Sequence, residues 1–81
     1  MQLIPVQVES EVVGETDQTP CRFFWEGRWI EIDQVEDRWY QGPGNPEWPM
    51  ADYFKVIGSD LREYLLKRDL EAGDWFLLKR W

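Results

Sequence analysis

The sequence contains no histidine and a single cysteine, Cys21. Without histidine, the chain lacks the commonest general base and the commonest metal ligand of proteins. One thiolate can build neither an internal disulfide nor a zinc site within one chain. A phosphate-binding glycine motif is missing as well, because Gly42-Pro43-Gly44 is followed by Asn-Pro instead of Lys-Ser or Lys-Thr. We therefore predict a protein that is not an enzyme and that holds no cofactor and no metal.

Long apolar segments are absent too. No run approaches the roughly 20 apolar residues that a membrane-spanning helix requires. The first residues, Met1–Val6, lack the charged start and the long apolar core of a signal peptide. We expect a cytoplasmic protein without membrane contact. Asp33, Glu36 and Asp37 could form a weak site for a hard cation, but a solvated acidic face is the favoured interpretation.

Aromatic residues and negative charge are what the chain has in abundance. Its 81 residues suffice for one domain, 1–81, with 16% aromatic residues that include six tryptophans. Each aromatic side chain buries roughly 150–250 Å² when enclosed, which helps a domain whose core supplies only about 3–5 kcal/mol. The net charge of −7 makes nucleic acid a poor default partner. Residues 61–81 are the exception, because five bases outnumber four acids there.

Residues 21–32 read as two strands joined by a tight turn. Glu26-Gly27 fits the central positions of a primed turn, where glycine adopts positive φ at little cost. This register places Phe24 opposite Trp29 on one face, together with Arg22 and Glu31. The other face is predicted to point toward the core: Cys21, Phe23, Trp25, Arg28, Ile30 and Ile32.

The segments on either side of this hairpin differ in composition. Residues 3–8 predict a short strand, at the edge of the sheet because Pro5 lacks an amide donor. Residues 9–19 are acidic and polar and predict a mobile loop. The strand after the turn is expected to continue to about Gln41, with a bulge near Asp33-Gln34, because the apolar phase changes there. A helix over 33–40 is the alternative.

The second half of the chain predicts a loop and two hairpins. Residues 42–49 contain three prolines and two glycines, which is typical of a loop of restricted shape. A three-residue turn at 58–60 would pair Lys55 with Glu63, and a turn at 71–73 would place Leu66 opposite Leu78. These registers predict a shared core face of Phe54, Val56, Tyr64, Leu66, Phe76 and Leu78.

Together these patterns predict an all-β fold. We expect five or six antiparallel strands in meander order, curled into a small barrel or roll of SH3-like architecture. A short helix over 59–70, capped by Ser59, is the alternative to one of the strands. Fold analogy of this kind carries no function.

The leading functional hypothesis is a non-enzymatic module that binds a protein through exposed aromatic side chains. Six tryptophans are too many for one small core to enclose. Trp48 could instead fold back and cap that core. The candidate partner-binding residues are Phe24, Trp29, Trp48, Trp75 and Trp81.

The alternative is an accessory domain that binds single-stranded nucleic acid through the 67–81 hairpin, where aromatic residues alternate with bases. The favoured interpretation of these bases is that they only keep the hairpin soluble while the aromatic rings pack. The candidate contacts are Lys67, Arg68, Lys79 and Arg80. A third possibility is pairing of edge strands, so we expect a monomer or a weak homodimer.

The order and spacing of aromatic and charged residues carry a resemblance over about residues 3–81. The segments concerned are Arg22–Trp29, Val35–Trp39, Asp52–Val56, Arg68-Asp69 and Gly73–Leu77. They resemble an uncharacterised small bacterial domain family of unknown function, found stand-alone and appended to Y-family DNA-polymerase-like proteins. The resemblance implies no activity and no functional residues, but it implies an accessory role in DNA repair through protein or DNA contacts. These 81 residues hold no polymerase portion and are acidic, which argues for docking to a basic protein over direct DNA binding.

Overall fold

The structure, a computed structural model, describes residues 3–13, 17–42 and 50–81. Within these ranges the chain forms seven strands and no helix. The strands are β1 (Ile4–Pro5), β2 (Val8–Val13), β3 (Asp17–Trp25), β4 (Arg28–Gln41), β5 (Ala51–Gly58), β6 (Glu63–Asp69) and β7 (Trp75–Arg80). They form one sheet in the order β1-β7-β6-β5-β4-β3-β2, and all neighbours are antiparallel. The predicted all-β class is therefore confirmed, although the described strands number seven and not five or six.

Both helical alternatives are wrong. Residues 33–40 lie within β4, and residues 59–70 contain the β5–β6 turn and strand β6. No helix in the described ranges is long and apolar enough to cross a membrane. Most of the predicted 42–49 loop, including Trp48, lies outside the described residues.

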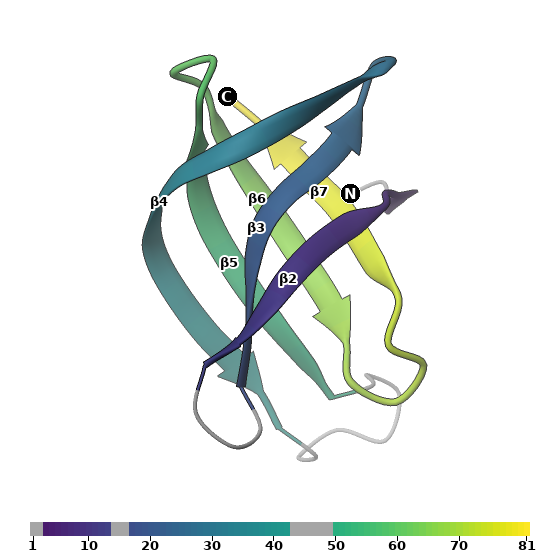
Figure 1. Cartoon of the computed structure of the whole chain (residues 1–81). Helices are drawn as coiled ribbons and strands as arrows, with labels where there is room; N and C mark the ends of the chain where they lie inside the picture. Colours follow the sequence, from purple (N-terminus) through teal and green to yellow (C-terminus); the bar gives the residue numbers. More distant parts are fainter. Residues whose placement is uncertain (1–2, 14–16, 43–49) are drawn as a thin grey trace.

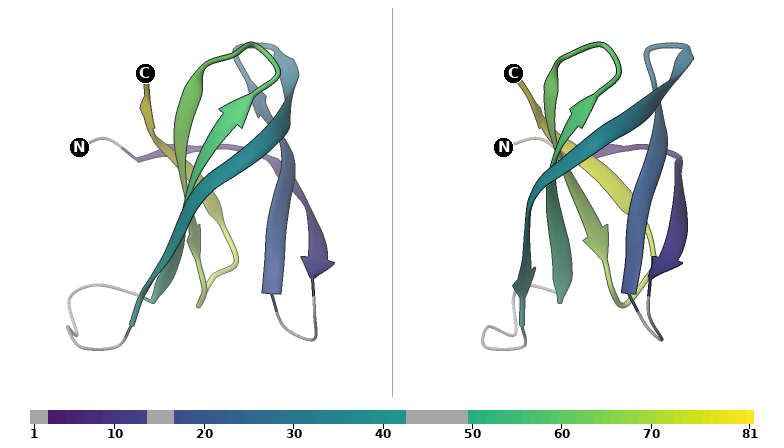
Figure 2. Two further views of the ribbon diagram at one scale, coloured as in Figure 1. Left: turned by 90° about the vertical axis from the view of Figure 1, so that its left-hand side faces the viewer. Right: turned by 60° about the vertical axis from the view of Figure 1, so that its left-hand side comes forward.

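The sheet curls into a half-barrel because β4 is long and bent. In Figure 1, β4 runs diagonally across the molecule from β5 to the β3–β4 turn. The views in Figure 2 show β2 and β3 facing β5, β6 and β7 across the curl. The pairing of β4 with β5 shifts register between Ile32 and Gln34 and again between Val35 and Asp37. The first shift confirms the predicted bulge near Asp33-Gln34, and bulges of this kind bend a strand and increase its twist.

The core fills the inside of the curl. The buried cluster consists of Phe23, Ile30, Phe54, Val56, Tyr64, Leu66, Trp75 and Leu77. The rings of Phe23 and Tyr64 meet edge to face, with centroids 4.8 Å apart, so the core joins β3 to β6 directly. Ile4, Val6 and Val8, predicted to share a face, all pack against this cluster.

The N-terminal segment connects the two ends of the sheet. The amide of Val6 donates to the carbonyl of Trp75 in β7 at 3.1 Å, and the carbonyl of the next residue, Gln7, accepts from the amide of Phe24 in β3 at 2.9 Å. Adjacent residues thus bond to strands on opposite sides of the curl. Pro5 lies at the end of the sheet order, as its missing amide donor predicts.

The 3–8 segment is therefore not one strand, and the predicted mobile loop over 9–19 is wrong where the chain is described. Residues 9–13 continue β2 and residues 17–19 begin β3. Cys21, expected to be buried, is half-buried, beside a register shift between β2 and β3. Acidic side chains on the solvent face of a strand give the same polar pattern as a loop, which explains the difference.

The register of the last hairpin also differs from the prediction. Leu66 lies opposite Leu77 and Arg68 opposite Trp75, because the pairing shifts by one residue between Leu65 and Leu66. A one-residue shift exchanges the two faces of a strand. Trp75 and Leu77 therefore enter the core, whereas Phe76 and Leu78 are only partly buried. The β5–β6 register also differs, with Lys55 opposite Leu65, but an offset of two residues leaves each side chain on its predicted face.

This register predicts unequal effects for two neighbouring leucines. We expect Leu77→Ala to destabilise the domain by about 2–5 kcal/mol, because it removes a buried side chain and leaves a cavity. Leu78→Ala is the matched control and should cost less than about 1.5 kcal/mol, because that side chain is only partly buried. Urea unfolding followed by circular dichroism would compare them. Equal losses would contradict the register shift.

Candidate functional site

An exposed cluster on the β3–β4 hairpin forms the first candidate site. Phe24 and Trp29 lie opposite each other, and their rings meet edge to face with centroids 5.5 Å apart. The guanidinium of Arg22 lies 4.5 Å from the centre of the Trp29 ring. Phe24 and Trp29 are 38% and 37% exposed. We call these three residues the aromatic patch.

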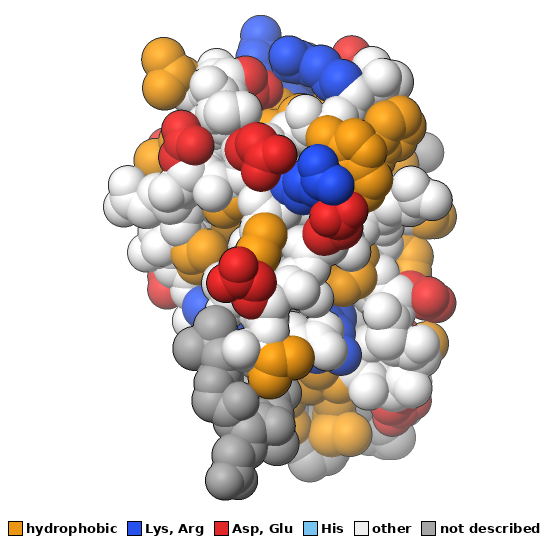
Figure 3. All heavy atoms as spheres, in the orientation of Figure 1, with side chains coloured by type: hydrophobic (Ala, Val, Ile, Leu, Met, Phe, Trp, Pro, Cys, Tyr) orange, Lys and Arg blue, Asp and Glu red, His pale blue; other side chains and the backbone are white. Residues whose placement is uncertain are grey.

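Acidic neighbours hold the patch in place. Arg22 donates from Nε and Nη2 to the two carboxylate oxygens of Glu9 at 2.9 and 2.6 Å, and its Nη1 lies 3.7 Å from Glu31. The hydrogen bond from Arg22 lowers the pKa of the Glu9 carboxyl, and the same bond raises the pKa of Arg22. Figure 3 shows hydrophobic side chains next to basic and acidic ones on the half of the molecule that carries β2, β3 and β4. Phe24 and Trp29 thus lie on the outer face of the hairpin, where β2 leaves more than a third of each residue exposed.

A second aromatic surface lies on the outer face of β4 to β7. Directly paired residues place Trp39, Tyr53, Lys67 and Phe76 in one row. Trp39 stacks on Tyr53 with centroids 5.4 Å apart.

Trp81 follows β7 and is 47% exposed. The ammonium groups of Lys55 and Lys79 lie 5.0 and 4.5 Å from its ring. Lys55 is also paired with Glu36 and Glu63, so its charge is largely matched.

The structure separates the remaining predicted site residues. Trp75 is 8% exposed within the core and Lys67 is 8% exposed under the Tyr53 ring, so neither offers much surface to a partner. The Nε of Arg68 is buried on the inner side of the sheet. Arg80 lies at the far end of β7 and bonds to Glu26. The bases of the 67–81 hairpin therefore do not form one continuous surface.

A polar hollow at one end of the half-barrel was not predicted. It measures about 300 Å³ and is lined by Trp25, Glu26, Arg28, Asp60, Arg62, Tyr64 and Arg80. Three separate segments supply these residues: the β3–β4 turn, the β5–β6 turn with the start of β6, and the end of β7. One signal was available in the sequence, because Arg28 is the one charged residue on the otherwise apolar inner face of the hairpin.

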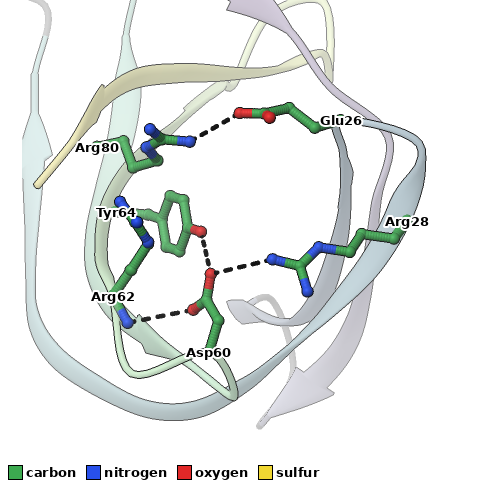
Figure 4. A network of polar contacts seen from close by, with 6 residues as sticks. All are labelled: Glu26, Arg28, Asp60, Arg62, Tyr64 and Arg80. Atoms are coloured by element: carbon green, nitrogen blue, oxygen red, sulfur yellow. Dashed lines mark hydrogen bonds and ion pairs between the residues drawn. The ribbon is translucent and has the colours of Figure 1, made fainter.

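Polar contacts hold the walls of this hollow, as Figure 4 shows. The Tyr64 hydroxyl donates to Asp60 Oδ2, and the Arg62 amide donates to Asp60 Oδ1 at 3.2 Å. Arg28 Nη2 lies 3.7 Å from Asp60 Oδ2. Across the hollow, Arg80 Nη1 donates to Glu26 Oε1 at 2.7 Å.

Unusual backbone positions shape the two turns. Glu26 and Gly27 both have positive φ, 51° and 80°, as the predicted primed turn requires. Leu61 has a φ of 66°, which is strained for a residue with a branched side chain. A Cβ on Gly58 would lie 2.7 Å from an Asp60 oxygen and 2.8 Å from Ile30 Cγ2. A larger residue at this position would therefore require the side chains of Asp60 and Ile30 to shift.

Burial and hydrogen bonding set the protonation of this site. Burial is the largest influence on Tyr64 and, with the bond to Asp60, raises the pKa of its hydroxyl to about 12. Burial alone would raise the pKa of Asp60. Hydrogen bonds from Tyr64 and the Arg62 amide, with the charge of Arg28, lower it below its usual value. Asp60 is therefore a carboxylate and Tyr64 a hydrogen-bond donor at neutral pH.

Neither the geometry of potential metal ligands in the described ranges nor similarity to known proteins indicates a function. In the described ranges, no group of three His, Cys, Asp or Glu residues is arranged to hold a metal ion. No family model, no curated protein and no solved structure matches this chain.

The Tyr64–Asp60 bond predicts a pH-dependent contribution to stability. Because folding raises the pKa of Tyr64, its contribution is fully present below about pH 10, the ordinary tyrosine value. It is lost as pH rises toward about 12. We expect Tyr64→Phe to cost about 1–3 kcal/mol at pH 8 and less at pH 11. Urea midpoints of both proteins at the two pH values would test this, and an unchanged difference would contradict the assigned bond.

Proposed function

We propose that this domain is a non-enzymatic protein-binding module and that the aromatic patch is its contact surface. The observation that carries the proposal is the exposed Phe24–Trp29 pair with Arg22 stacked on it. Tryptophan and arginine are enriched among the residues that dominate binding energy at protein interfaces.

The patch is also ordered before any partner binds. Trp29 is held by Phe24 on one side and by Arg22 on another, and two glutamates fix Arg22. Immobilising a free side chain on binding costs about 0.5–1.5 kcal/mol, so side chains that are already fixed favour association.

Charge indicates the partner's chemistry. The carboxylates of Glu9 and Glu31, 53% and 62% exposed, flank the patch in a chain of net charge −7. Electrostatic complementarity favours a partner with an apolar pocket bordered by basic side chains. The predicted cytoplasmic location, and the role in DNA repair that the family resemblance implies, would suit such a partner.

Binding of single-stranded nucleic acid is the second candidate function. The observation in its favour is the position of Trp81 between Lys55 and Lys79 on the outer face. Less favourable are the ion pairs of Lys55 with Glu36 and Glu63. We expect weak or no binding of a fluorescent oligonucleotide even at low salt, where phosphate contacts are strongest.

Comparative pull-downs from native cell extract test the main proposal. Wild-type protein and Trp39→Ser, the matched control, should retain the same partner, because Trp39 lies outside the aromatic patch. Trp29→Ser should lose that partner by about tenfold or more, as expected for removal of a dominant interface residue. Urea unfolding would verify that both variants remain folded.

If all three proteins retained the partner equally, the aromatic patch would not be the contact surface. A retained partner identical to the bait would indicate a homodimer, which sedimentation across a concentration series would detect. A single sedimentation coefficient for the monomer at every concentration would leave only a different protein as the partner.

A further inference from the structure

The hollow collects arginines in a chain that is acidic overall. Arg28, Arg62 and Arg80 line it, together with only two carboxylates, Glu26 and Asp60. The local formal charge is therefore +1, against −7 for the whole chain. In Figure 3, Lys and Arg side chains gather at the top of the view, the end where the β3–β4 and β5–β6 turns lie in Figure 1. Such a concentration of positive charge favours the approach of anions.

The two carboxylates accept hydrogen bonds from only a few of the N–H groups that line this hollow. Asp60 is satisfied mainly by the Tyr64 hydroxyl and the Arg62 backbone amide. Arg28 approaches it only at 3.7 Å and its side chain remains 65% exposed. Each guanidinium carries five N–H donors. Most of the donors around the hollow are therefore left for another acceptor.

Arg62 is the least committed of the three arginines. Among the described residues its guanidinium makes no ion pair, and the dashed line that reaches Arg62 in Figure 4 ends on the backbone amide. Trp25, which also lines the hollow, has a buried Nε1 without an acceptor in the described part of the chain. Buried donors without acceptors are uncommon and call for an explanation.

We propose that this hollow binds a small oxyanion of the phosphate or carboxylate type, held chiefly by Arg62 and Arg28. A guanidinium fork matches the paired oxygens of either group with two parallel hydrogen bonds. A volume of about 300 Å³ is larger than such a group needs, so the anion can enter the hollow together with water molecules. Asp60 would repel an anion, but Arg28 partly offsets its charge, and its two oxygens accept from Tyr64 and the Arg62 amide. The proposal does not depend on the aromatic patch, which lies on the outer face of the hairpin.

The strained β5–β6 turn supports this assignment. Leu61 adopts a positive φ and is 84% exposed, so its side chain gains little from packing. The turn does place the Asp60 carboxylate against Tyr64 and brings Arg62 to the rim of the hollow. Strain of this kind is often retained where it positions a functional group.

Titration of the intact protein with inorganic phosphate and, separately, with malonate would test the proposal. Sodium chloride at equal ionic strength serves as the reference. The side-chain Nε–Hε resonances of the arginines would be followed by NMR and the melting temperature by circular dichroism. We expect saturable shifts at Arg62 and Arg28 and a rise in melting temperature with at least one anion, because a ligand that binds only the folded state stabilises it.

Two variants with the same change of charge complete the test. Arg62→Gln keeps the backbone amide that Asp60 accepts from, so it should fold, but its affinity should fall by about tenfold or more. Lys79→Gln removes a positive charge outside the hollow and should bind as the wild type does. Non-saturable shifts with both anions, or equal affinity in Arg62→Gln and wild type, would overturn the proposal. The anion that saturates identifies whether phosphate or carboxylate is preferred.

Discussion

The Tyr64 side chain connects the core of this domain to its polar end. Its ring packs edge to face on Phe23 with 1% of the residue exposed, and its hydroxyl donates to Asp60. A buried tyrosine usually finds a partner for its hydroxyl, and here the β5–β6 turn supplies one, because Gly58 leaves room for the Asp60 and Ile30 side chains at their present positions. The position of Asp60 therefore follows from core packing, and the geometry of the hollow follows from Asp60.

The β3–β4 hairpin contributes side chains to both candidate sites, one on each of its faces. Because side chains alternate along a strand, Phe24 and Trp29 point outward while Trp25 and Arg28 point to the inner side and line the hollow. The two positive φ angles of Glu26 and Gly27 fix this register. A slip of one residue would exchange the two faces, so both candidate sites depend on the same turn.

The sequence predicted this hairpin well because its signals were local. A Glu-Gly turn and the pairs Phe23–Ile30 and Phe24–Trp29 are separated by few residues, and the structure confirms them. The predicted register of the last hairpin was wrong because Trp75, Phe76, Leu77 and Leu78 are all apolar. Both faces of the strand therefore resemble a core face, and the sequence pattern does not reveal the one-residue shift. The hollow could not be predicted from the sequence. Its residues come from positions 25–28, 60–64 and 80, which only the curl of the sheet brings together.

Basic side chains are the scarcer partners in this chain, with nine Lys and Arg residues against sixteen Asp and Glu residues. Acids therefore compete for each guanidinium: Arg22 is bound by Glu9, Arg38 by Asp52 and Arg80 by Glu26. Arg62 lies at the rim of the hollow, and its guanidinium has no acidic partner among the described residues. In a chain with an excess of acids, an unpaired arginine is unexpected. Exposed ion pairs contribute little to stability, so leaving Arg62 unpaired costs the fold almost nothing. The unpaired guanidinium of Arg62 does remain available to a ligand. Because it contributes little to stability but can contribute to binding, this end of the molecule is where function is expected.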